Sequence, residues 1–180
     1  MSDRVLLVMD DTFELSTIAA ALKLHGTNVI GEAQKESSAI LLMRSMQPNV
    51  LLIDMHLSEE HSITIANHIR KEVPTIGVVV LVACADLRLL GDFRSDLPVG
   101  AKVVIKKSMN NVATLCDVIS ESRVLEPDSP VTWVSGNISL HEKALENLLS
   151  QLTDLQIETL RLVADGLTNA EISRMRFVSE

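Results

Sequence analysis

The sequence predicts an α/β fold, a doubly wound five-stranded parallel sheet with helices on both faces, followed by a small all-α region. Three observations predict it. Up to about residue 123, short apolar runs alternate five times with longer helical segments, as expected for strands that are each followed by a helix. The apolar runs are continuous Val, Leu and Ile, which is typical of strands buried on both faces. Turn and helix-breaking residues separate the segments.

The predicted elements follow one another in a regular order. The apolar runs predict strands at Val5–Met9, Val29–Glu32, Val50–Asp54, Ile76–Val82 and Lys102–Ile105. The segments between them predict helices at Thr12–His25, Lys35–Met46, Ser62–Glu72, Asp86–Phe93 and Asn110–Arg123. Gly26, Pro48 and Pro74 follow the first three helices, where residues of this kind end a helix. We therefore expect residues 1–123 to form one domain.

Two further regions follow this domain. Residues 124–151 predict a linker in which a helical period returns near its end, and residues 152–180 predict two short helices. Trp133 in the linker is either a docking anchor or a hydrophobic pin that holds the linker in place. Two patterns in the last region fit capping boxes, namely Thr153 with Gln156 and Thr168 with Glu171.

The composition indicates a globular chain with an aliphatic core. Hydrophobic residues make up 47% of the chain and aromatic residues only 2%, with a mean hydropathy of +0.25. No apolar stretch reaches the roughly 18 residues of a membrane span. The N-terminus has no signal-peptide character, so we expect a cytoplasmic protein without membrane partners. Cys84 and Cys116 are isolated, which favours two reduced thiols over a disulfide.

The charge of the chain argues against broad affinity for nucleic acids. The net charge is −8, with an isoelectric point near 5.1, whereas such affinity requires Lys and Arg to neutralise phosphates. From Pro127 onward, four Lys and Arg stand against eight Asp and Glu, so the C-terminal part is no more basic than the rest. A local basic patch remains compatible with these totals.

Three carboxylates follow predicted strands. Asp10 and Asp11 end the first apolar run, and Asp54 ends the third. Open α/β sheets bind ligands at the carboxyl edge of their strands, where these acids would meet. Clustered carboxylates must take up protons or hold a cation, and Mg²⁺ prefers such oxygen ligands. A lysine after the strand at 102–105 would complete a site for an anionic phosphoryl group, so we predict Asp54 as its acceptor.

Each of these residues also has an ordinary explanation. The acid pair can be loop acids, Asp54 a helix N-cap, and the lysine a solvated side chain; the combination in this order favours the site. Lys106 and Lys107 are both candidates for the lysine, and the spacing favours Lys107 by about two to one. His56 and His61 have no zinc spacing, so we expect them to be exposed loop residues rather than metal ligands.

Residues 1–123 resemble the receiver domain of two-component response regulators. The resemblance is carried by the acid pair, by Asp54 at the end of the third strand and by Lys107 after Gly100 and Ala101. It implies a flavodoxin-like fold and a signalling protein whose partner is a histidine kinase. Such a protein is not an enzyme and catalyses at most its own phosphorylation and dephosphorylation. It implies these roles: Asp54 as phosphoacceptor; Asp11, Asp54 and the backbone carbonyl of His56 as Mg²⁺ ligands, assisted by Asp10; and Lys107 as the contact to phosphoryl oxygens.

Residues 152–180 resemble the first part of the LuxR-type (NarL/FixJ-like) helix-turn-helix. The resemblance is carried by Leu152, Thr153, Glu158, Leu160, Leu162, Gly166, Leu167, Asn169, Glu171, Ile172 and Val178 to Glu180. In that module the second helix reads bases in the major groove. The sequence stops at Glu180, where that helix would begin, so we expect no recognition helix and no DNA-binding residues here. DNA becomes a partner only if the natural protein extends past Glu180; a homodimer is a further expectation.

The chain departs from the receiver pattern at two strand positions, in the loop after Asp54, where Ser58 and Ser62 replace the usual proline and glycine, and in a longer stretch between Val82 and Lys107. Val82 stands where the family places a Thr or Ser, and Val104 stands where it places a switch Tyr or Phe. The main hypothesis is a response regulator in which Mg²⁺-dependent phosphoryl acceptance on Asp54 controls transcription. The alternative, motivated by both valines and by the altered loop after Asp54, is an atypical receiver-like interaction module that signals without phosphorylation. A metal-dependent phosphatase ranks last, because His56 occupies the position of its general acid.

Overall fold

A computed structural model describes residues 3–55, 57, 62–83, 97–106, 111–123, 129–134, 150–164 and 167–176. The chain divides into two compact units. The first comprises Met1–Ala83 with Asp96–Asn137, and the second comprises Cys84–Ser95 with Ile138–Glu180. The helix predicted at Asp86–Phe93 lies outside the described residues.

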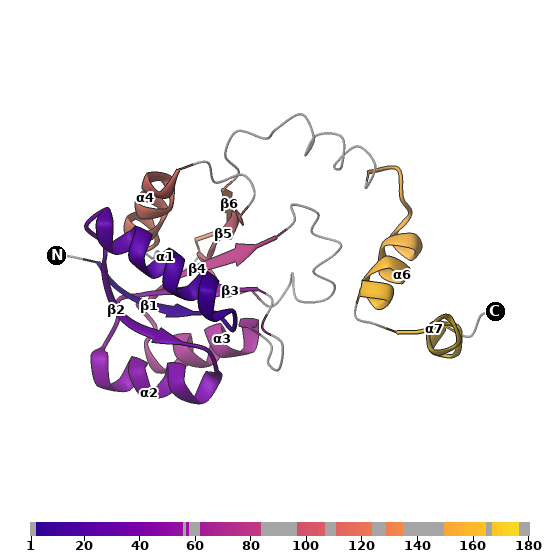
Figure 1. Ribbon diagram of the computed structural model, residues 1–180, viewed down its shortest axis with the longest axis horizontal. Coiled ribbons are helices and arrows are strands. Elements are labelled where there is room, and N and C mark those ends of the chain that lie inside the picture. Colours follow the sequence, from indigo (N-terminus) through magenta and orange to yellow (C-terminus); the bar gives the residue numbers. More distant parts are fainter. Residues whose placement is uncertain are drawn as a thin grey trace. The chain divides into compact units, whose positions relative to one another are not determined.

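The first unit contains a sheet of six parallel strands among its described residues, in the order β2-β1-β3-β4-β5-β6 (Figure 1). The strands are β1 (Arg4–Val8), β2 (Asn28–Ala33), β3 (Val50–Asp54), β4 (Gly77–Val82), β5 (Lys102–Ile105) and β6 (Thr132–Val134). The predicted α/β class and the first five strands are confirmed. The predicted strand number is wrong by one, because the linker adds β6 in parallel pairing beside β5, with Trp133 opposite Val103.

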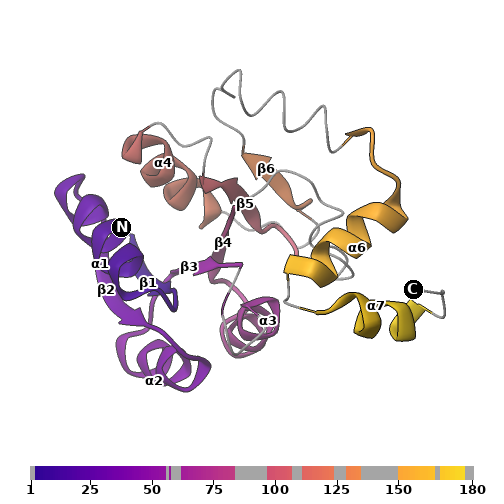
Figure 2. The same cartoon turned by 45° about the vertical axis from the view of Figure 1, so that its right-hand side comes forward.

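The buried aliphatic runs explain the order of the strands. Every residue of β3 and β4 is buried, whereas β2 and β6 at the two edges are largely half-buried or exposed. Helices α1 (Thr12–Leu24) and α4 (Val112–Ser122) cover one face of the sheet, and α2 (Glu36–Met46) and α3 (Ser62–Glu72) cover the other (Figure 1 and Figure 2). Both faces of the central strands are therefore removed from water, as continuous Val, Leu and Ile require.

Local sequence explains where the helices begin and end. The side chains of Asp11 and Asn111 cap α1 and α4 by accepting hydrogen bonds from backbone N–H groups in the first turn. Gln47 ends α2 in the left-handed conformation with φ of 49°, and Gly26 follows α1 with φ of 83°. The acid pair thus lies between the end of β1 and the first turn of α1.

The described part of the second unit contains two helices, α6 (Asp154–Ala164) and α7 (Asn169–Arg176). Both predicted capping boxes are confirmed: Thr153 and Gln156 bond each other's backbone N–H groups, and so do Thr168 and Glu171. Ile157, Leu162 and Ile172 are buried, whereas Leu155, Leu160, Val163 and Met175 are largely exposed. Among the described residues of the whole chain, no helix is both long and apolar enough to cross a membrane.

Candidate functional site

Asp54 lies at the carboxyl end of β3, near the middle of the sheet. Its register partner on β4 is Leu81, and the next backbone N–H, that of Met55, donates to the carbonyl of Leu81 over 2.8 Å. The Asp54 residue is only 4% exposed. A buried carboxylate needs a charged or hydrogen-bonding partner, because an isolated buried charge is strongly destabilising.

Lys106 supplies that partner. It is the first residue after β5, and its Nζ lies 2.5 Å from Oδ2 of Asp54. The sequence left Lys106 and Lys107 as alternatives and the spacing favoured Lys107. Lys107 lies outside the described residues, and the lysine that the structure brings to Asp54 is Lys106. Spacing could not separate the two, because one residue more or less in the preceding loop exchanges their places.

Glu14 is a second acidic partner of the same lysine. Its two carboxylate oxygens lie 2.9 and 3.1 Å from Nζ of Lys106. Glu14 stands in the first turn of α1, and its backbone N–H donates over 2.7 Å to Oδ1 of Asp11, the cap of that helix. Glu14 is a residue of this site that the sequence motifs did not predict. Its place three residues after Asp11, in the first turn of the helix after β1, was the signal available.

These contacts determine the charge state of Lys106. Partial burial works to lower the pKa of this ammonium group, but the hydrogen bonds and charges of Asp54 and Glu14 together outweigh burial and raise the pKa above its usual value. Lys106 is therefore a fixed cation at the end of β5. A fixed cation beside a carboxylate is the arrangement that stabilises charge arriving as a phosphoryl group.

Asp11 of the acid pair is linked to this group through Glu14. Asp11 uses Oδ1 as a helix cap, and the backbone carbonyl of Asp10 accepts from the side-chain amide of Gln34 over 3.1 Å. No three His, Cys, Asp or Glu side chains within the described ranges converge closely enough to hold a metal ion. His56, whose carbonyl was the fourth expected ligand, lies outside these ranges. The donors that are present are carboxylate oxygens, the type that Mg²⁺ prefers.

The other strand ends are aliphatic. Val82 at the end of β4 and Val104 in β5 are both buried. Val103 and Ile105, on either side of Val104, are also buried. None of these three residues of β5 is aromatic, so the strand supplies no ring at the switch position or next to it. Neither strand end offers a side-chain hydroxyl to a group on Asp54.

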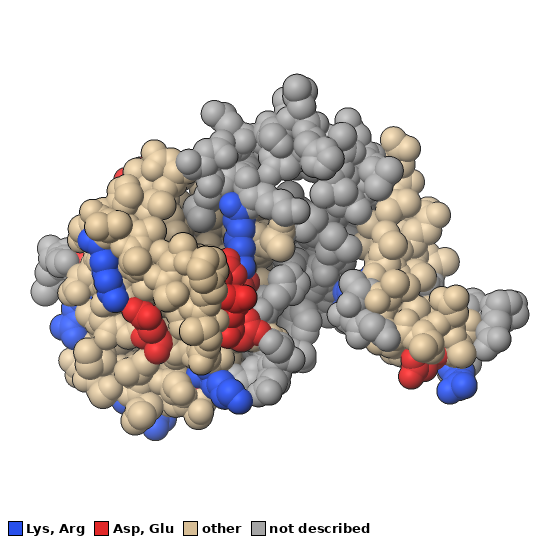
Figure 3. Space-filling view, viewed as in Figure 1, with Lys and Arg blue, Asp and Glu red and all other residues tan. Residues whose placement is uncertain are grey.

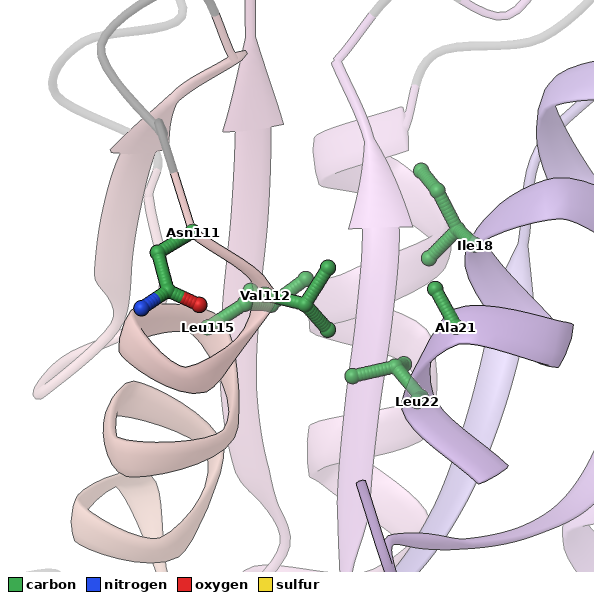
Figure 4. Close-up of a pocket in the computed structure, with 6 residues that line it drawn as sticks. All are labelled: Ile18, Ala21, Leu22, Asn111, Val112 and Leu115. Carbon is green, nitrogen blue, oxygen red and sulfur yellow. The ribbon is translucent and has the colours of Figure 1, made fainter. Parts of the chain in front are cut away.

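Two surface features lie apart from these contacts. A small pocket of about 90 Å³ between α1 and α4 is lined almost wholly by apolar side chains and by none of the acids (Figure 4). Its lining residues are Ile18, Ala21, Leu22, Asn111, Val112 and Leu115. On the face shown in Figure 3, the Lys and Arg side chains of the first unit are scattered and form no continuous basic patch.

Comparison with known families identifies the first unit. The family described as "Response regulator receiver domain" matches residues 5–120. The DNA-binding transcriptional activator EvgA of Escherichia coli strain K12 is 21% identical over 174 residues, which cover 97% of this chain and 82% of EvgA. The transcriptional regulatory protein LiaR of Bacillus subtilis strain 168 is 27% identical over 179 residues, covering 98% of this chain and 83% of LiaR.

Solved structures support the fold. The response regulator RcsB in complex with DNA matches with a TM-score of 0.58 and 20% identity, over 99% of this chain and 85% of that protein. The isolated receiver domain of RcsB from Salmonella enterica serovar Typhimurium, solved with a phosphomimetic, matches with a TM-score of 0.56 and 18% identity, over 71% of this chain and 95% of that domain. At these identities, the likeness concerns the fold alone.

Proposed function

This chain belongs to the response regulator receiver family, and we propose that Asp54 accepts a phosphoryl group from a histidine kinase and so controls a transcriptional output. The observation that carries the proposal is the pairing of Asp54 with Lys106 over 2.5 Å at the carboxyl edge of the sheet. A carboxylate oxygen attacks phosphorus only if the negative charge of the incoming group is neutralised, and a fixed lysine ammonium contributes to that. The comparisons favour this function over an interaction module that works without phosphorylation.

Mg²⁺ is the cofactor that we propose for this step. Asp10, Asp11, Asp54 and the backbone carbonyl of His56 would hold it, and bound Mg²⁺ would neutralise charge on the phosphoryl group. Asp11 at present gives Oδ1 to the cap of α1, and Asp54 gives Oδ2 to Lys106. The carboxylate of Asp54 remains the nucleophile, and Lys106 orients the phosphoryl oxygens. The only chemistry we assign beyond acceptance is self-phosphorylation from small donors and self-dephosphorylation.

The output that we propose is DNA binding through the C-terminal region. We assign residues 1–123 to the receiver, 124–151 to the linker and 152–180 to the first part of a LuxR-type helix-turn-helix, whose first helices would be α6 and α7. EvgA and LiaR are named as transcriptional regulators, and RcsB is solved with DNA. Base readout in such a module needs a further helix in the major groove. Such an output places the protein with DNA in the cytoplasm.

Intact-mass measurement tests the acceptance step. The protein is incubated with Mg²⁺ and a small phosphodonor such as acetyl phosphate, beside an Asp54→Asn variant that keeps the shape of the side chain. We expect wild type to gain the mass of one phosphoryl group and the variant to gain none. Absence of any gain in wild type, under conditions that label an ordinary receiver, would overturn the proposal.

A further inference from the structure

Glu14 shares the ammonium group of Lys106 with Asp54. A lysine ammonium has three N–H donors, and three carboxylate oxygens surround this one: Oδ2 of Asp54 at 2.5 Å and the two oxygens of Glu14 at 2.9 and 3.1 Å. Among the described residues, the number of carboxylate oxygens around the ammonium group therefore equals the number of its donors. A new anionic group at Asp54 therefore finds the ammonium already engaged by a second carboxylate.

The position of Glu14 is fixed by the fold. Its backbone N–H bonds the carboxylate of Asp11, and its residue lies in the first turn of α1. The side chain of Glu14 is 32% exposed, that of Lys106 is 24% exposed and that of Asp54 is 5% exposed. Water therefore screens the Glu14 charge only in part, and the helix keeps that charge next to the strand ends.

We propose that Glu14 competes with a phosphoryl group on Asp54 for the ammonium group of Lys106 and thereby shortens the lifetime of the phosphorylated state. The inference rests on the proposed function. A phosphoryl group brings additional charge and three acceptor oxygens, and it needs a donor from Lys106. Glu14 retains donors of that lysine and places a like charge within a few ångströms of the new group, which disfavours the loaded state. Glu14 is in this sense a positioning residue, acting through Lys106.

The reaction that ends the phosphorylated state is hydrolysis. A water oxygen attacks phosphorus, the bond between phosphorus and the Asp54 oxygen breaks, inorganic phosphate leaves and the carboxylate is restored. Hydrolysis becomes faster when the acyl phosphate is destabilised more than the transition state that follows it. The phosphoryl oxygens carry more negative charge in the acyl phosphate than in the loose, metaphosphate-like transition state, so the lysine contact stabilises the acyl phosphate more than the transition state, and its diversion to Glu14 favours hydrolysis.

A Glu14→Gln variant tests the inference. Glutamine keeps the size of the side chain and one oxygen acceptor for Lys106 but removes the charge. After loading with acetyl phosphate and Mg²⁺ and rapid removal of the donor, intact mass gives the half-life of the phosphorylated protein. We expect the half-life to increase about three- to tenfold, the effect of one partly screened charge near another. Glu36→Gln is the matched control, since Glu36 stands in the first turn of α2 and should leave the half-life unchanged.

Ionic strength separates charge competition from a structural defect. If the Glu14 charge acts as proposed, the difference between wild type and Glu14→Gln shrinks as salt is raised from about 0.05 to 0.5 M, because salt screens partly exposed charges. Glu14→Ala, with circular dichroism as a check of folding, should lengthen the half-life as well. An unchanged or shorter half-life in both variants, with normal loading, overturns this inference and leaves the proposed function standing. No loading in wild type overturns both.

Discussion

The carboxyl ends of β1 and β3 differ in chemistry from those of β4 and β5. The first two deliver Asp10, Asp11 and Asp54, whereas Val82 and Val104 in the other pair are buried and aliphatic. Within the part of the chain that the structure describes, Lys106 makes the charged contact from the second pair; it lies just beyond β5 and pairs with Asp54. The strands that deliver the acids are therefore not the strands at which the family resemblance leads us to expect residues that sense a new group.

The difference implies that one sheet can have the residues to accept a phosphoryl group without the residues to relay its presence. A carboxylate with a fixed cation beside it meets part of what the chemistry of acceptance needs, and we propose that Mg²⁺ supplies the rest. A relay needs a two-state element that the new group biases, for which the family resemblance leads us to expect a hydroxyl and an aromatic ring. The strands supply neither, so any response of β4 and β5 to the new group passes through Lys106 and backbone packing.

The largest effect should come from removing the cation. We expect Lys106→Met to lower the rate of phosphoryl loading about 100-fold or more, because a preorganised electrostatic contact to the reacting group is lost. The rate of mass gain with acetyl phosphate and Mg²⁺ measures it. Lys107→Met is the informative companion and should load nearly as wild type does. If Lys107→Met is the defective variant instead, the assignment from spacing is right and the contact to Lys106 is not the functional one.

A second prediction concerns how firmly β4 is held. An alanine Cβ at Gly77 would lie 2.6 Å from the backbone carbonyl oxygen of Ser122, at the end of α4. Because backbone must then move, we expect Gly77→Ala to lower the free energy of unfolding by about 1–3 kcal/mol. Urea denaturation measures the change. The control is Gly31→Ala on β2, where the nearest atom is the tip of Leu6 at 3.0 Å, and a loss as large there would argue against tight packing of β4 in particular.

A third prediction restores a hydroxyl to β4. Val82→Thr places a polar group at a position that is 1% exposed, so we expect the unphosphorylated protein to lose about 1–2 kcal/mol of stability. If the hydroxyl points to the site, binding of beryllofluoride with Mg²⁺ should recover part of this loss by giving the hydroxyl an acceptor. Urea denaturation with and without beryllofluoride compares the two states. An equal loss in both would mean that Val82 is not adjacent to the bound group.

The smallest effect concerns the helix caps of the second unit. An ionisable side chain caps one helix there, and a neutral side chain caps the other. Hydrogen bonds from the hydroxyl and the backbone N–H of Thr168 lower the pKa of Glu171 below its usual value near 4.5. A lowered folded pKa means that the stabilisation of α7 is present above pH 4.5 and is lost as the pH falls through the lower folded value. Gln156 caps α6 without a titrating group.

Amide exchange of the first turns of α6 and α7 between pH 6 and 3 compares these caps. After correction for the intrinsic rates, we expect protection of α7 to decline with acid while that of α6 stays constant. Glu171→Gln should make α7 behave as α6 does. Parallel declines in both helices would mean that a global acid transition, and not the Glu171 cap, is responsible.

The strands were predictable because burial on both faces leaves a strong local pattern. The predicted bounds Val50–Asp54 and Lys102–Ile105 agree with β3 and β5 residue for residue. Strand β6 could not be predicted, since three residues carry too little pattern and their extended conformation depends on pairing with β5. One hydrogen bond of this pairing runs from the Thr132 N–H to the carbonyl of Ala101, just before β5. Half-buried Trp133 lies within this strand, which supports its interpretation as a pin for the linker.

The candidate site was predictable only in part, for a related reason. The position of Asp54 follows from one strand, but the identity of its lysine depends on how the loop before β5 meets the sheet. The place of Glu14 in the first helical turn after Asp11 is a local signal, but it does not reveal the contact to Lys106 across 92 positions of sequence. Residues defined by their own strand can be predicted, and residues defined by a partner need the folded chain.

The most direct test of acceptance at Asp54 is chemical mapping of the phosphorylated residue. Sodium borohydride reduces an aspartyl phosphate to homoserine, which peptide mass spectrometry locates. After treatment with Mg²⁺ and acetyl phosphate, we expect acceptance at Asp54 to give homoserine at position 54, none without the phosphodonor, and very little in Lys106→Met. Homoserine at another aspartate, or none at position 54 in a protein that has gained phosphoryl mass, would contradict it.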